Sequence, residues 1–183
     1  MGQVEWAREL AARLLEEPLP QRWAHTQGVA AQAASLRRIL AADADLVVAA
    51  AWLHDIGYAP HLVHTRLHPL DGARYLRDIV GADERLCRLV AHHTCAMVEA
   101  HERGLAEELT GEFEPEREDL ADALIYCDMT IGPAGEKVTL EGRLRDILDR
   151  YEPDTVVHRA ISRAAPELHA AVSRVQARLA AHG

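Results

Sequence analysis

Hydrophobic residues recur every three to four positions along most of this chain, which is the period of an amphipathic α-helix. The spacing predicts helices over residues 3–16, 21–40, 44–54, 83–97, 100–109, 117–130, 140–150 and 154–181, and a further helix that begins near Pro69. Segment 44–54 is apolar on every side, so we expect it to lie at the centre of the bundle. The sequence TIGPAGEKVT, at 130–139, predicts a surface loop that could form a short hairpin.

No repeat or linker divides the 183 residues. We therefore expect a single all-α domain over residues 1–183, with a motif-bearing core at about 20–132 and C-terminal helices at 139–183 that complete the bundle. Composition agrees with this fold class, because 49% of the residues are hydrophobic but only 4% are aromatic, which favours helices over strands.

The formal charge of −9 argues against a nucleic-acid polymer as partner, since phosphate backbones are bound by clustered Lys and Arg. A small phosphorylated substrate remains compatible, because a bound metal supplies positive charge locally. Three cysteines without a CxxC pair favour a reducing, cytoplasmic location. No segment approaches the roughly 18 apolar residues of a membrane span, so we expect no membrane partner. The terminal helices could support a homodimer.

The central apolar helix ends on two ionisable residues, His54 and Asp55, within the sequence AAWLHDIGYAP. A buried polar group is costly unless a partner satisfies it. Helical neighbours point about 100° apart, so both side chains reach one site only if the helix ends there. Gly57 permits such an end.

Other polar residues face the interior by the same helical spacing, or from a helix start. The inward set is His25, His54, Asp55, His68, His93 and Asp128. His92, in contrast, falls toward the polar side of its helix. Hydrogen bonds could satisfy one or two such groups, but six together favour a metal, because imidazole and carboxylate ligands suit first-row transition ions. We expect one or two ions per chain, with Fe or Mn favoured and Zn, Co, Ni or Mg possible.

The order of these residues resembles the HD superfamily of metal-dependent phosphohydrolases. The superfamily pattern is an early histidine, an adjacent His-Asp pair, further histidines and a late aspartate. Here the matching motifs are His25, His54-Asp55, HPLDGARYL, AHHT and IYCDMT, which span residues 22 to 128. The resemblance implies an all-α domain that hydrolyses a small phosphorylated substrate, a nucleotide or another phosphoester.

The resemblance also implies roles for single residues. His25, His54, Asp55 and Asp128 would hold one metal, and His68 and His93 a second metal, with Asp55 as a bridge that also orients the attacking water. The arrangement looks closest to the branch that cleaves dinucleoside polyphosphates. The chain departs from many relatives at Tyr58, where they carry a lysine near the substrate phosphate.

Three further residues are candidates for contact with substrate. Arg22 and Arg66 could clamp phosphate, because guanidinium binds phosphate through two parallel hydrogen bonds. His92 could protonate the leaving group.

Two other functions fit the same residues. An HD-type protein with two irons could activate dioxygen and cleave a C–C or C–P bond, and an iron-dependent, oxygen-consuming reaction would identify it. Alternatively, the chain could be a metal-stabilised module that binds a nucleotide without catalysis.

Overall fold

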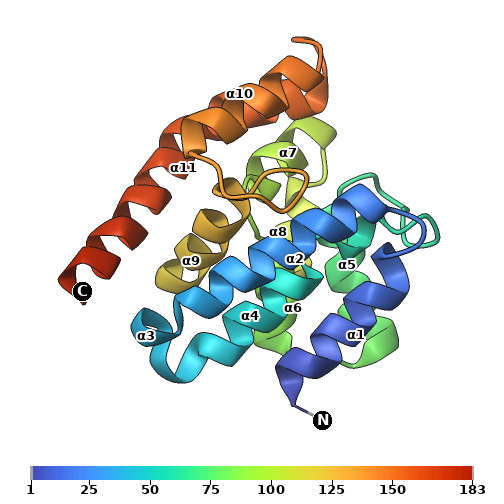
Figure 1. Ribbon diagram of the computed structural model, residues 1–183. Helices are drawn as coiled ribbons and strands as arrows, with labels where there is room; N and C mark the ends of the chain where they lie inside the picture. Colours follow the sequence, from blue (N-terminus) through green and yellow to red (C-terminus); the bar gives the residue numbers. More distant parts are fainter. Residues whose placement is uncertain (1, 183) are drawn as a thin grey trace.

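The computed structural model describes residues 2–182, and α4 (Ala44–Leu53) lies at the centre of the helices they form (Figure 1). Helix α4 packs against α1 (Gln3–Leu15), α2 (Pro20–Ser35), α6 (Glu84–Ala91) and α9 (Glu118–Met129). Eight of its ten residues are buried, which explains its apolar sequence and confirms its predicted central place. The described part of the chain is all-helical, as predicted.

The remaining helices surround this core. The bounds are α3 (Arg37–Leu40), η1 (Ala41–Asp43), η2 (Ile56–Tyr58), α5 (His68–Arg74), the π-helical η3 (Tyr75–Val80), α7 (Ala96–Arg103), α8 (Ala106–Glu112), α10 (Leu140–Arg150) and α11 (Val156–Ala181). Helices α10 and α11 run beside each other along the edge of the molecule opposite α1 (Figure 1). They bury a second apolar cluster against α9, which includes Ile125, Leu144 and Leu168. No helix in the described range combines the length and hydropathy needed to cross a bilayer.

Three predicted helices differ in extent from those observed. The segment 21–40 is broken at Leu36, which separates α2 from α3. The segment 83–97 stops at Ala91, and the turn that follows contains Thr94 at φ 51°. The segment 100–109 is divided by Gly104, whose left-handed φ of 71° ends α7 before α8 begins.

The loop at 130–139 lies against α2 and is fixed there by two glycines. Gly135 has φ 82°, and a Cβ atom at Gly28 would lie 2.6 Å from the Gly135 carbonyl oxygen. Within residues 2–182 the only β-type pairing is one isolated antiparallel bridge, between Ile131 and Lys137. The predicted hairpin is therefore reduced to a single bridge, and the loop is held to the helix that carries His25.

Candidate metal centre

The central helix ends immediately before the His-Asp pair. His54 is the C-cap residue of α4, and Asp55 leaves the helical region at φ −101° and ψ 3°. This break brings both side chains to the same interior site, as the sequence required. The reason for Gly57 is close packing: a Cβ atom there would lie 2.0 Å from the His68 carbonyl oxygen. The glycine therefore lets the start of α5, with its histidine, approach the His-Asp turn.

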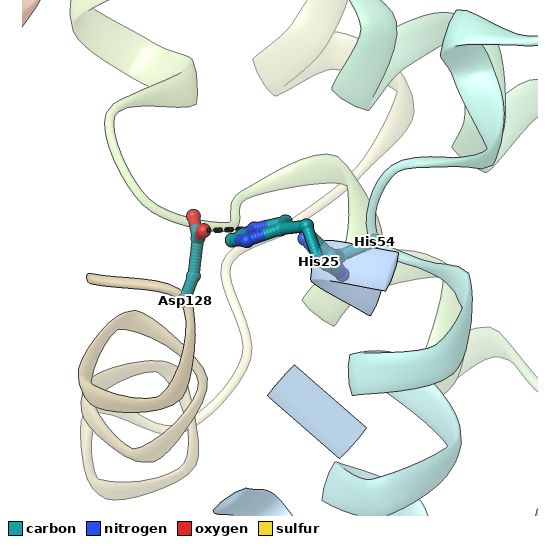
Figure 2. A group of neighbouring side chains, drawn as sticks. All are labelled: His25, His54 and Asp128. Carbon is teal, nitrogen blue, oxygen red and sulfur yellow. Dashed lines mark hydrogen bonds and ion pairs between the residues drawn. The ribbon is translucent and has the colours of Figure 1, made fainter. Parts of the chain in front are cut away.

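The first triad consists of His25, His54 and Asp128, which converge from α2, the end of α4 and the last turn of α9 (Figure 2). Their exposed fractions are 3%, 0% and 8%. One possible ligand atom from each lies within 4.8 Å of the others. His25 Nε2 is 3.0 Å from Asp128 Oδ1. Three such ligands from three helices match the donors that transition metals bind.

The second triad consists of Asp55, His68 and His93, and again one possible ligand atom from each lies within 4.8 Å of the others. His68 is the first residue of α5, and His93 lies in the turn between α6 and α7. The Nε2 atoms of these histidines are 3.1 Å apart. Asp55 also connects this triad to the first, because its Oδ1 is 3.3 Å from His68 Nε2 and its Oδ2 is 3.3 Å from His54 Nε2.

The tautomers of the buried histidines fit a cation at this centre. The Nδ1 atoms of His25, His54 and His93 lie 3.1, 2.8 and 2.7 Å from the carbonyl oxygens of Gly132, Ala51 and Val90. Each Nδ1–H therefore donates to a carbonyl, and in a neutral ring Nε2 is left as an acceptor. His54 Nε2 is fully buried yet forms no hydrogen bond to any described residue. Converging lone pairs of this kind require a cation or a shared proton between them.

The electrostatics of the site point the same way. Burial and the neighbouring His68 and His54 rings lower the pKa of His93 to about 3, so its ring is neutral at pH 7, as a metal ligand must be. Burial opposes ionisation of Asp128, but the adjacent His25 and His54 rings outweigh it and hold its pKa well below the usual range. Asp55 behaves similarly: burial alone would raise its pKa, but the larger effect of Arg22 and His54 brings the pKa well below its ordinary value. Both carboxylates are therefore available as anions.

Arg22 and Tyr58 form a stack beside the second triad. The Arg22 guanidinium lies 3.9 Å from the centre of the Tyr58 ring, and that ring stacks on His68 with centroids 3.9 Å apart. Arg22 Nη1 also donates to Asp55 Oδ2 at 2.8 Å. On the other side of the centre, the Thr94 hydroxyl donates to Asp128. These contacts orient the carboxylates and one imidazole from outside the triads.

A cleft of about 650 Å³, including its open mouth, leads to the centre. Asp55, His68, His93 and Asp128 lie at its base. Helices α10 and α11 form the opposite wall through a set of charged and apolar residues: Arg143, Ile147, Arg150, Tyr151, Val157 and Ile161. Residues after 139 thus shape the entrance, and the 130–139 loop lies against α2.

The structure brings together the six residues of the inward set, and it places Arg22 beside them. It does not bring Arg66 or His92 to the cleft. Arg66 is exposed in the loop before α5 at φ 66°. His92 Nε2 pairs with the Phe113 carbonyl oxygen at 2.7 Å, because the end of α6 directs this ring toward the segment after α8.

Sequence reasoning missed Arg143, Arg150, Thr94 and the stacking of Tyr58. A signal for Arg143 exists: it shares an apolar helix face with Leu140, Leu144 and Ile147 in the sequence LEGRLRDILDR. The contacts of Thr94 and Tyr58 had no comparable signal, because both residues lie outside the regular helices that periodicity describes.

A family model described as the HD domain matches residues 22–154, and this range contains both triads. No curated protein and no solved structure matches the chain.

Proposed function

Because this chain belongs to the HD-domain family, we propose that it is a metal-dependent phosphohydrolase acting on a small phosphorylated substrate, a nucleotide or another phosphoester. The observation that carries the proposal is the pair of buried triads, with Asp55 of the second triad close to His54 of the first, at the base of an arginine-lined cleft. The two triads would hold the metal ions. Bound there, a metal would supply Lewis-acid chemistry, lowering the pKa of a coordinated water and neutralising charge on phosphoryl oxygens.

The residues of the chain have distinct roles in this proposal. The backbone carbonyls of Gly132, Ala51 and Val90 fix three imidazoles with Nε2 toward the centre. Asp55 faces both triads and orients the attacking water. Arg22 holds Asp55 and presents the rest of its guanidinium to the cleft, where it binds a phosphate oxygen. Arg66 and His92 do not line the cleft, and neither has a role in this proposal.

The test is elemental analysis of protein purified without chelator, followed by assays on a panel of phosphoesters. We expect about one to two equivalents of iron or manganese and hydrolysis that depends on the metal. Asp55→Ala should abolish both metal content and hydrolysis. His169→Ala, which removes an exposed imidazole of α11, should change neither.

Other results would select a different function. Full metal content in Asp55→Ala would refute the assignment of the site. Oxygen consumption by the iron-loaded protein, with product formed only in air, would indicate a diiron oxygenase. Nucleotide binding without turnover under any metal would indicate the non-enzymatic module.

A further inference from the structure

Arg143 is a buried charge whose hydrogen bonds are incomplete. Only 7% of the residue is exposed, and it lies among the apolar residues Leu140, Leu144 and Ile147 of α10. Its Nε atom is buried and has no hydrogen-bond partner in the described structure. The acceptor it does reach is Asp146 Oδ2, at 3.3 Å from Nη1. Buried charges are normally fully paired because desolvation is costly, so this guanidinium has spare capacity for a ligand.

Arg143 lies where two cavities adjoin. One is the cleft above the metal centre, and the other is a smaller pocket of about 250 Å³ beside His25. Arg22, Arg143 and Arg150 line both cavities. Asp146 pairs with Arg150 Nη2 at 2.5 Å as well as with Arg143, so a single carboxylate serves two guanidinium groups. An incoming anion could replace it, since its side chain is 43% exposed.

The charges at the cleft, together with their ion-pair partners, favour an anionic ligand once metal is bound. The carboxylates are Asp55, Glu99, Asp128 and Asp146, and the guanidinium groups that balance them are Arg22, Arg103, Arg143 and Arg150. Without metal the two sets cancel. Every divalent ion in the triads would add two positive charges to a partly enclosed site, which favours a ligand with more than one negative charge.

We infer that Arg143 and Arg150 bind a second phosphate group of the substrate, which is therefore an ester or anhydride with at least two phosphates. This inference rests on the proposed function and names its substrate class. The first phosphate lies at the metal centre beside Arg22, which contacts Asp55. The second lies between Arg143 and Arg150, where the two cavities meet. The organic part packs against the apolar wall of Ile147, Tyr151 and Ile161.

The test compares the binding of inorganic pyrophosphate and orthophosphate by isothermal titration calorimetry. The protein is used as purified, and its metal content is measured before and after titration so that loss of metal is recognised. The variants are Arg143→Met, which removes the charge and retains volume, and Arg150→Gln. The matched control is Arg145→Gln, because Arg145 is an exposed arginine of the same helix.

We expect the wild-type protein to bind pyrophosphate more tightly than orthophosphate. Arg143→Met should weaken pyrophosphate binding about 10- to 100-fold, the range for a lost charge-assisted hydrogen bond, and should change orthophosphate binding by less than about threefold. Arg150→Gln should act in the same direction, and the control should change neither affinity. Because the buried charge is incompletely paired, the melting temperature of Arg143→Met should equal or exceed that of the wild type.

Two results would overturn the inference: equal effects of Arg143→Met and Arg145→Gln, or a lowered melting temperature in Arg143→Met with the preference for pyrophosphate intact.

Failure of this inference is distinguishable from failure of the proposed function. If no phosphoester is hydrolysed but the preference for pyrophosphate depends on Arg143, the hydrolase proposal fails and the binding site stands. If mono- and diphosphate esters are hydrolysed with the same kcat/KM by wild type and Arg143→Met, the hydrolase stands and the second phosphate site does not.

Discussion

Gly57→Ala should disturb the second triad more than the first, because the added methyl group collides with the backbone of His68. A Cβ atom at this position would lie 2.0 Å from the His68 carbonyl oxygen and 2.8 Å from the Gly72 nitrogen. Ordinary contact begins at 3.4 Å, so the first residue of α5 must move by about 1.4 Å. Both obstructing atoms belong to the backbone and cannot rotate away. We therefore expect a cost near the upper end for overpacking, about 3 kcal/mol of unfolding free energy.

That displacement also exceeds the roughly 0.2 Å within which metal–ligand distances are held. His68 should leave the second triad, whereas the first triad, built on α2, α4 and α9, should be less affected. We expect metal content to fall by about one equivalent and the melting temperature to fall by about 6–12 °C, the usual scale for a domain of this size. Urea unfolding and elemental analysis on the same samples measure both effects.

The control is Gly111→Ala, an exposed glycine of α8 whose Cβ atom would meet nothing within 4 Å. Alanine favours a helix over glycine, so this variant should be unchanged or up to about 1 kcal/mol more stable, with full metal content. If Gly57→Ala matched this control in both stability and metal content, the close approach of α5 to the His-Asp turn would not be what positions the second triad.

Three further predictions test other parts of the molecule. Asp128→Asn should lose metal from the first triad. The control is Asp122→Asn, at a buried aspartate of the same helix that pairs with Arg174; it should keep its metal and lose about 1 kcal/mol of stability. Equal metal loss in both variants would contradict the assignment. Removing metal with a chelator should lower the melting temperature, because the facing lone pairs and carboxylates then repel, and adding Mn²⁺ should restore it; an unchanged melting temperature in scanning calorimetry would count against a metal centre. Hydrogen bonds from Arg74 lower the pKa of Glu112, so this ion pair stabilises the fold above the pKa of the unfolded state and is lost as pH falls through the folded pKa. Glu112→Gln should therefore be about 1 kcal/mol less stable at pH 7 in urea titrations. The difference should shrink as pH falls below the unfolded-state pKa of about 4.3 and vanish once pH is below the lowered folded pKa; a constant difference would refute the linkage.

The inward-facing polar residues were predictable because the spacing of hydrophobic residues identifies the buried face of each helix. His25 and Asp128 lie on such faces, and the structure buries both. The same rule applied to α10 would have identified Arg143. The break between His54 and Asp55 was predicted for the right reason, since one helix could not direct both side chains to one site.

The rest depended on contacts between distant segments. Helix α6 ends at Ala91, and the turn that follows contains Thr94 at positive φ. This turn could not be predicted from the sequence, because threonine rarely adopts a positive φ. The role of Gly57 comes from the backbone of α5, eleven residues further along the chain. The division into two triads follows from distances across helices, and these become measurable only when the helices are packed.

The loop that holds His25 has a consequence for the order of events during synthesis. His25 is 103 residues from Asp128, whose carboxylate lies next to its Nε2 atom. It is 107 residues from Gly132, whose carbonyl oxygen accepts a hydrogen bond from its Nδ1 atom and so fixes the orientation of the ring. A growing chain emerges from the ribosome N-terminus first, so α2 and α4 are present long before either partner. Up to that point the nascent chain offers histidines with no late aspartate and no fixed ring orientation. Metal loading of the first triad should therefore begin only once the chain has emerged through residue 132, and a nascent polypeptide arrested before Asp128 should bind metal at that triad far more weakly.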